Sequence, residues 1–477
     1  MSGKGKNTAA KAGIGYTIGN VLVKGINFIS LPIFSRIMTT DQFGVYNVFV
    51  SYEAILCLIV GFAMHSSLRT ANLDYKGKID EFTSSISIVY ILTTVFMMLI
   101  VAVFGQWLEP LMGFSITVLF LLVVYSFGSA ILTLYNNRIS IDYRYKTFLV
   151  ISAVNSIGNV LISLLLMFTI CSEQRDLGRI LGVTITMGGI AVVLLLSMYK
   201  KSKPRVNKKY WKFAFLYSLP IVPHGVSQVL LAQFDRIMIR NIISDSVAGI
   251  YSLAANIKLI LTIVTTSIAT AWGNWFYEQM EKNDIKTIKK YAVMITALFS
   301  IFSIGLLSIS PEMIFILGGK EYDQGKYVAI PMIVDAFILF IYNVIVQTEY
   351  YKKKTVYIMI GTIVAAIIDI VLNVIFIPMY GFIAAAYTTL FAYICYLIMH
   401  LLISYRLVRF SVLPGKWLVV FTALVVGTAA ADIVLIDMMW LRWLICAVLV
   451  IPMTLLLFRA YKKSKKQSSK SESKKED

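Results

Sequence analysis

Long apolar runs separated by short polar stretches make up almost the whole chain. An apolar run of about 20 residues crosses the ~30 Å hydrocarbon core of a bilayer as a helix. These runs are continuously apolar, whereas the strands of a membrane barrel alternate polar and apolar residues. We therefore predict an all-α polytopic membrane protein with about fourteen transmembrane helices, at residues 13–35, 44–66, 82–107, 114–136, 147–170, 178–199, 213–235, 247–276, 289–317, 327–350, 356–378, 381–404, 416–436 and 440–459.

A pattern near the N-terminus returns about 200 residues later. The two copies are AGIGYTIGNVLVKGINFISLPIFSRIMTTDQFGVYNVFVS, Ala12–Ser51, and YSLPIVPHGVSQVLLAQFDRIMIRNIISDSVAGIYSLAANIKL, Tyr217–Leu259. Each reads as an apolar helix ending in Arg-Ile-Met (Arg36, Arg236), a polar turn, and a second apolar helix opened by a Gly-Val/Ile-Tyr sequence (Gly44, Gly249). The chain is therefore predicted to be duplicated.

The largest polar interruption, residues 199–212, divides six spans from the next six. Six is an even number, so both halves enter the membrane from the same side and form a parallel repeat about an axis along the membrane normal. The predicted segments are a cytoplasmic basic tail (1–12), a six-helix bundle (13–199), a cytoplasmic basic linker (200–212), a second six-helix bundle (213–404), two additional transmembrane helices (416–459) and a disordered basic cytoplasmic tail (460–477).

Composition and charge agree with a membrane protein. Apolar residues make up 58% of the chain and the mean hydropathy is +0.78, which excludes a soluble fold. With the N-terminus inside, inner segments hold 34 of the 44 Lys and Arg residues and outer segments hold 8, which predicts that both termini are cytoplasmic. The basic C-terminal tail is expected to contact anionic membrane lipids, and nucleic acid is not expected as a partner.

Motifs of soluble enzymes are absent. There is no P-loop, dinucleotide turn or H-E-x-x-H, and the outer loops are too short to hold the acid and base groups of a membrane sugar polymerase or transferase. The cysteines lack metal-ligand spacing and are expected to be core residues (Cys57, Cys171, Cys395, Cys446). We expect no enzyme activity, no metal and no cofactor, with energy supplied by an H⁺ or Na⁺ gradient or by the membrane potential.

Ionisable groups inside apolar spans are the candidate chemistry, because such groups are costly in hydrocarbon and commonly functional. On the first span Asn20, Lys24 and Asn27 share one helix face. Aligning the two copies on Arg36 and Arg236 pairs Lys24 with His224, and aligning them on Gly44 and Gly249 pairs Glu53 with Lys258. Asp335 and Asp369 lie on later spans, and Arg36 and Arg236 are assigned to the outer rim. Pro220 and Pro223 predict a bend near His224.

Two interpretations of these groups stay open. In the structural one, Lys24 and Glu53 form a buried ion pair that fixes the packing of the first two spans. In the functional one, Lys24, Lys258 and His224 line a hydrated cavity between the halves and attract an anionic substrate. The repeat partner of Lys258 is an acid, so symmetry supplies Lys258 with no counter-ion. Asp335 and Asp369 are either hydrogen-bonded structural acids or groups that couple transport to H⁺ or Na⁺.

The stretch SLPIFSRIMTTDQFGVYNVF, with its proline, its Arg-Ile-Met and its TTDQFGVY turn, resembles the bacterial oligosaccharide flippases of the polysaccharide-biosynthesis transport family, also called Wzx flippases. That family shares a superfamily with lipid II flippases and multidrug/toxin extruders. The resemblance implies that an undecaprenyl-pyrophosphate-linked oligosaccharide repeat unit, of an O-antigen or capsular type, crosses to the outer leaflet of the cell membrane through a central cationic cavity by alternating access. A polysaccharide polymerase and other export components are implied partners.

The resemblance also implies cavity cations on spans 1, 2, 7 and 8. Span 1 offers Lys24 and span 8 offers Lys258, but span 2 has Glu53 in its interior, which departs from the family pattern. A lipid II flippase is an alternative that shares fourteen spans. A cation-coupled multidrug extruder is a second alternative, although such a protein normally stops at twelve.

Our first prediction concerns topology. In a variant lacking the four native cysteines, a single cysteine placed in residues 199–212 should not react with an impermeant thiol reagent added outside the cell. The charge bias puts this loop in the cytoplasm, and a cysteine in the outer loop CSEQRDLG serves as the reactive control. Labelling of the 199–212 loop from outside would overturn the scheme.

Overall fold

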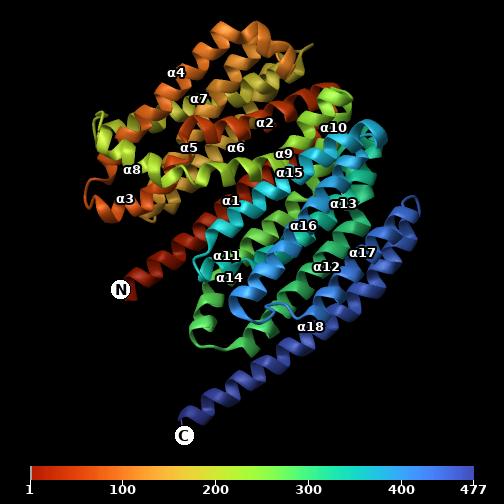
Figure 1. Cartoon of the computed structure of the whole chain (residues 1–477). Coiled ribbons are helices and arrows are strands. Elements are labelled where there is room, and N and C mark those ends of the chain that lie inside the picture. The colour runs from red at the N-terminus through yellow and green to blue at the C-terminus, as the bar shows by residue number, and fades with distance from the viewer. Residues whose placement is uncertain (1–2, 477) are drawn as a thin grey trace. The chain divides into compact units, whose positions relative to one another are not determined.

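The computed structural model describes the backbone of residues 3–476 and the side chains of residues 15–459 and 462, apart from Thr17, Asn20, Val21 and Thr270. Within these residues the regular structure is entirely helical (Figure 1). The predicted all-α class is confirmed. The tails predicted at 1–12 and 460–477 fall almost wholly on residues outside the described side chains.

The predicted spans correspond one to one with helical segments. Among the described residues, twelve segments are long and apolar enough to cross a membrane, and one bent pair of helices makes a thirteenth. They match predicted spans two to fourteen in order. The first predicted span falls in the helix Gly3–Ile37, part of which lies outside the described side chains. The protein is therefore a polytopic membrane protein.

Contacts between helices group the chain into two compact units, which are described separately. Unit 1 contains residues 1–252 and 370–382. Its elements are α1 (Gly3–Ile37), α2 (Thr40–Gly61), η1 (Met64–Ser67), α3 (Leu68–Asp74), α4 (Ile79–Met112), α5 (Ile116–Ile141), α6 (Tyr145–Phe168), α7 (Arg175–Lys201), α8 (Lys208–Ser218), α9 (Ile221–Ile242), most of α10 (Asp245–Ile257) and the end of α15 (Thr355–Tyr380). The predicted division into bundles at residues 200–212 stays a prediction.

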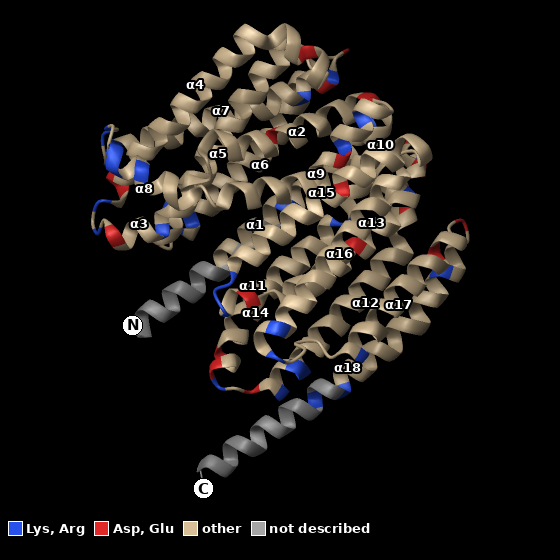
Figure 2. Ribbon diagram, in the orientation of Figure 1, with Lys and Arg blue, Asp and Glu red and all other residues tan. Residues whose placement is uncertain are grey.

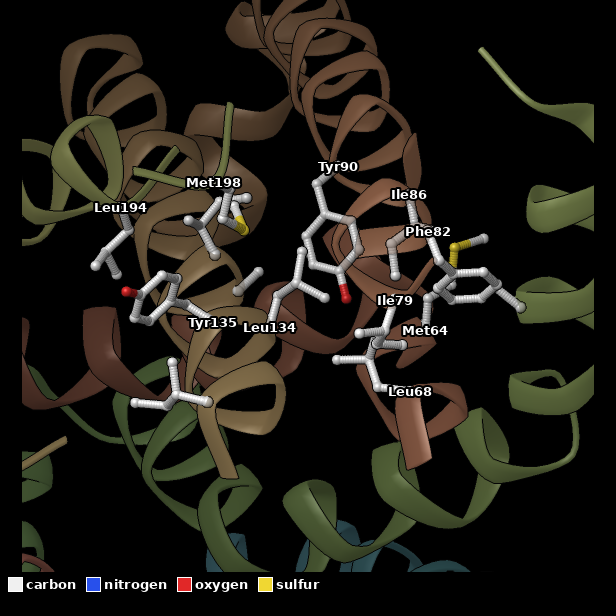
Figure 3. Close-up of a cluster of buried hydrophobic side chains, with 14 of the residues drawn as sticks. Met64, Leu68, Ile79, Phe82, Ile86, Tyr90, Leu134, Tyr135, Leu194 and Met198 are labelled. Carbon is white, nitrogen blue, oxygen red and sulfur yellow. The ribbon is translucent and has the colours of Figure 1, made fainter. Parts of the chain in front are cut away.

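The core of unit 1 is an apolar cluster between its helices (Figure 3). Phe82 and Tyr90 of α4 pack with Leu68 of α3 and Leu134 of α5, and all four are fully buried. Leu194 of α7 completes one side of the cluster. In lipid, helices gain little from burying apolar area against each other, so this close packing contributes through van der Waals contact.

The turn between α1 and α2 is stabilised by a capping box. The Thr39 hydroxyl accepts a hydrogen bond from the Gln42 backbone N–H, and the Gln42 side-chain oxygen accepts one from the Thr39 N–H, both at 3.2 Å. This arrangement satisfies two of the backbone donors that every helix start leaves open. The TTDQF part of the repeated motif therefore fixes where α2 begins.

The seventh span is broken where the sequence places its first proline. α8 ends at Ser218 and α9 starts at Ile221, and their axes differ by 51°. Pro220 has no N–H to donate, and its ring clashes with the preceding turn. The predicted bend is confirmed, and it lies four residues before His224.

Unit 2 contains residues 253–369 and 383–477. Its elements, besides the end of α10 and most of α15, are α11 (Leu259–Glu281), α12 (Ile285–Gly318), η2 (Lys320–Gly325), α13 (Lys326–Ile345), α14 (Gln347–Tyr351), α16 (Ile383–Val408), α17 (Gly415–Val434) and α18 (Met439–Glu476). Lys, Arg, Asp and Glu gather at helix ends and turns, and few lie in the middle of helices (Figure 2).

The last two spans, α17 and α18, pack on α12. Arg442 of α18 is 1% exposed and forms an ion pair with Glu312 of α12, and its Nη1 also donates to the Ser308 carbonyl at 2.6 Å. Ser308 in turn donates through its hydroxyl to Asp432 of α17 at 3.3 Å. These polar contacts fix the two additional helices to the rest of unit 2 where apolar packing alone is weak.

Candidate transport site

Lys24 lies in α1 and is half-buried. In the described part of the chain, no Asp or Glu carboxylate forms an ion pair with its ammonium group. Asn27, one turn further along, is exposed, and the side chain of Asn20 lies outside the described residues. A half-buried lysine without a carboxylate partner is available to an anion.

Glu53 lies in α2 and is 9% exposed. Its carboxyl has the Ser129 hydroxyl of α5 as a hydrogen-bonding neighbour. The ion pair between Lys24 and Glu53 that the sequence left open is not formed in this structure. Glu53 instead contributes a polar contact between α2 and α5.

Asp235 of α9 is the centre of a polar cluster in unit 1. It accepts hydrogen bonds from the Tyr251 hydroxyl of α10 and from Asn373 Nδ2 of α15, the latter at 2.9 Å. Asp235 is 4% exposed, so these donors supply the polar partners that hydrocarbon cannot. His224 lies three turns earlier on α9 and is half-buried.

Lys258 lies at the junction where α10 ends and α11 begins. Its Nζ is 3.1 and 3.3 Å from the two carboxylate oxygens of Asp335 on α13. Repeat symmetry supplies Lys258 with no counter-ion, and the acid comes instead from Asp335, on another helix of unit 2. The Lys258 side chain is 23% exposed and that of Asp335 only 1%.

Asp369 of α15 is fully buried and accepts a hydrogen bond from the Thr389 hydroxyl of α16 at 3.0 Å. Arg36 lies exposed in the last turn of α1, whereas α9 continues six residues beyond Arg236. Arg236 therefore lies within its helix, half-buried beside Asp235. The two copies differ here because the second has a longer first helix.

The glycines of the two copies meet in unit 1. α2 and α10 each begin four residues before their glycine, so Gly44 and Gly249 occupy matching positions. A Cβ built on Gly44 would lie 1.8 Å from the Asp245 carbonyl oxygen, and one on Gly249 would lie 2.2 Å from the Thr40 carbonyl oxygen. The Thr40 and Ser246 hydroxyls also hydrogen-bond at 2.6 Å. Only glycine permits so close an approach of the two backbones.

Sequence reasoning missed Arg179, which it counted among the eight Lys and Arg residues of the outer segments. Its guanidinium is 6% exposed and lies 3.7 Å from the Phe34 ring centroid and 4.9 Å from that of Tyr46. Nη1 donates to Asn159 Oδ1 at 2.8 Å and to Ser163 Oγ at 2.9 Å. The sequence did show an arginine at the start of the sixth predicted span, and it lies one turn inside α7. Its charge is stabilised there by cation–π contacts with the two rings.

The described helices form an all-α polytopic membrane protein that holds ionisable groups inside its spans. The fold is similar to that of a solved lipid II flippase, MurJ, in an inward closed conformation, with a TM-score of 0.71, 16% identity, and 94% of this chain and 99% of that chain covered.

Residues 9–280 match the family described as polysaccharide biosynthesis protein, and the chain belongs to that family. One relative is a probable low-salt glycan biosynthesis flippase, Agl15, from Haloferax volcanii, which is 19% identical over 88% of each chain. Another is the capsular polysaccharide biosynthesis protein CapF from Staphylococcus aureus, 22% identical over 66% of this chain and 78% of that protein.

Our second prediction tests the glycine contact. In a variant lacking native cysteines, Thr40→Cys with Ser246→Cys should form a disulfide on oxidation, because the hydroxyls they replace are 2.6 Å apart. Gly44→Ala should weaken this crosslinking about fivefold or more, since overpacking costs ~1–3 kcal/mol. Crosslinking is read by gel mobility.

Gly427→Ala on α17 is the control, since a Cβ there would meet nothing within 4 Å. Equal crosslinking in the Gly44→Ala and Gly427→Ala backgrounds would show that the glycine contact is not formed in the membrane.

Proposed function

We propose that this protein is a flippase that moves an undecaprenyl-pyrophosphate-linked oligosaccharide repeat unit from the inner to the outer leaflet of the bacterial cytoplasmic membrane. Membership of the polysaccharide biosynthesis family and the names of its relatives support transport of a glycan. The transport route is a central cationic cavity with alternating access, and both termini are cytoplasmic. Membrane lipids, a polysaccharide polymerase and other export components are the proposed partners.

The observation that carries the substrate class is the half-buried Lys24 without a carboxylate partner. A pyrophosphate carries roughly two negative charges, and one charge at the bilayer centre costs at least ~2.5–3.5 kcal/mol. A fixed cation within the membrane offsets part of that cost. Asn27 and Asn20, on the same helix face, are assigned to the polar part of the substrate.

Lys258 is assigned to substrate binding only when its ion pair with Asp335 opens, because Asp335 neutralises its charge in this structure. Its side chain is partly exposed, so an incoming phosphate competes with the Asp335 carboxylate for the ammonium group. Release of Asp335 leaves a buried acid that must take up a cation or find new donors. Asp335 is therefore a candidate for coupling to H⁺ or Na⁺, and Asp369 is a second one. His224 is assigned to the substrate-binding face.

The membrane potential supplies a driving force of its own. Outward movement of each negative charge gains ~2.3 kcal/mol per 100 mV when the inside is negative. Alternating access is assigned to rocking of the two repeats, with the break at Pro220 as a bending point. Closure of the outer side is assigned to the contact between Gly44 and Gly249.

A lipid II flippase is the second candidate, favoured by the likeness to MurJ over 94% of this chain. Both candidates handle a polyprenyl pyrophosphate, so Lys24 keeps its part in either one. A multidrug extruder is disfavoured, since α17 and α18 add two spans that are fixed to α12 by buried polar contacts.

Our third prediction tests Lys24. Lys24→Gln should lower export of surface polysaccharide about 10- to 100-fold, because contacts to a charged group are worth ~1.5–3 kcal/mol, while Lys24→Arg should keep part of the activity. Both variants should be present in the membrane at the wild-type amount, as determined by immunoblot. Normal export by Lys24→Gln would remove Lys24 from the substrate site.

Our fourth prediction separates structure from binding at Lys258. Lys258→Gln should lower the unfolding temperature of the purified protein, because it leaves buried Asp335 without its cation, at a cost of up to ~3–5 kcal/mol. Lys258→Gln combined with Asp335→Asn should restore stability but not export. A double variant that is stable and exports normally would exclude both residues from transport.

A further inference from the structure

A buried acid–histidine pair lies in unit 2. Glu349 of α14 and His400 of α16 are both 0% exposed, and Glu349 Oε1 is 2.6 Å from His400 Nδ1. Among the residues that the structure describes, His400 is the only basic group in an ion pair with Glu349. Neither side chain belongs to the proposed substrate path.

The second polar atom of each side chain has no hydrogen-bond partner. Glu349 Oε2 and His400 Nε2 are both fully buried and unpaired within the described part of the chain. A Cβ at Gly361 of α15 would lie 2.5 Å from His400 Nε2, so the α15 backbone closes over this nitrogen. Buried polar atoms are nearly always satisfied, and these two leave the pair without the hydrogen bonds that would stabilise an uncompensated charge.

Two aromatic rings pack against the imidazole of the pair. The rings of Tyr342 and Tyr396 lie 4.9 and 4.5 Å from the imidazole. The titratable and polar groups near the pair come from every helix around it. They are Tyr342 of α13, Tyr350 of α14, Thr362 of α15 and Tyr396 of α16, and Tyr277 of α11 lies next to Tyr350. In addition, Thr348 next to Glu349 donates to Ser404 of α16 at 2.9 Å.

Net charge decides which protonation state such a site holds. A neutral imidazole beside a carboxylate leaves one uncompensated negative charge in a dry aromatic pocket, which is strongly unfavourable. A carboxylic acid with a neutral imidazole, or an imidazolium with a carboxylate, has zero net charge, and each holds exactly one more proton. The closed pair is therefore more stable with that extra proton than without it.

We propose that Glu349 and His400 form a proton-binding site, which holds one proton while α14 and α16 are in contact and exchanges it with water when they separate. The proton comes from water, and it returns to water when hydration stabilises the bare carboxylate. Lys352, Lys353 and Lys354 follow α14 directly, so the site lies near a helix end that water reaches. The link to transport rests on the proposed flippase function, whereas proton binding itself does not.

Proton binding is tested first without any substrate. The full-length protein is labelled with ¹⁵N-histidine, and its three imidazoles are followed by NMR as the pH changes. The His400 signal, assigned by its loss in His400→Gln, should titrate, and Glu349→Gln should shift its apparent midpoint. The exposed acid Glu109 of α4 provides the control variant Glu109→Gln, which should leave the midpoint unchanged. A His400 signal that stays constant over the whole pH range in which the protein is folded would overturn the proposal.

The link to transport is tested in vesicles containing a fluorescent undecaprenyl-pyrophosphate glycan. With one proton per substrate, a gradient of about one pH unit should change the steady-state ratio of flipped to unflipped substrate about tenfold. Glu349→Gln should flip the substrate without responding to the gradient, and Glu109→Gln should respond as the wild type does.

A wild-type protein that flips the substrate with no response to the gradient would overturn the coupling. A wild-type protein that does not flip it at all would reject the proposed function, and the histidine titration would then still decide the proton site. His400→Gln replaces Glu349→Gln in this comparison if the latter does not fold.

Discussion

Hydrocarbon offers no partner to an ionisable or hydrogen-bonding group, so each such group within these helices has to be satisfied by another part of the protein. The helices of this chain are arranged around that constraint. Arg442 reaches Glu312, Asp235 receives Tyr251 and Asn373, and Lys258 reaches Asp335. All of these contacts except the one from Tyr251 join helices that are distant in sequence, and each specifies a packing that apolar side chains alone would leave loosely defined.

Two groups of polar side chains lack some of these partners. They are Lys24 and the pair of Glu349 and His400. Among the described residues, Lys24 is half-buried without an ion-paired carboxylate, and the acid–histidine pair keeps two buried atoms without a hydrogen bond. In a membrane protein such groups are costly unless another species completes them. We assign an anionic substrate to the first and a proton to the second. In this proposal the first site recognises the cargo, and the second couples its movement to a proton gradient.

Much of the fold could be predicted from the sequence because hydrocarbon thickness sets the length of each apolar run. The apolar run 213–235 predicted a span, and Pro220 predicted its bend. Gly44 and Gly249 predicted that the two helices containing them correspond, and each lies four residues after the start of its helix. The partners within the membrane could not be predicted as well. Apolar runs do not reveal how each helix is rotated about its axis. The sequence therefore could not predict that Lys258 pairs with Asp335 and not with Asp369 or Glu53.

The pair of Glu349 and His400 shows the same limit. The two residues are 51 positions apart on different helices, and neither is at a spacing that marks a known site. The end of α9 was predicted wrongly for a different reason, since a repeat was assumed to keep its helix lengths. The second copy continues six residues past its arginine, whereas the first ends one residue after it.

The contact between the two glycines also has a consequence for the history of the chain. It is reciprocal: Gly44 approaches the first residue of α10, and Gly249 approaches the first residue of α2. A surface that meets its own copy in this way is what a two-fold axis produces between identical subunits. A single-copy ancestor would have formed the same contact as a homodimer, with one glycine facing itself. Gene fusion would then have made the association permanent, and left each half free to acquire charged groups that the other lacks.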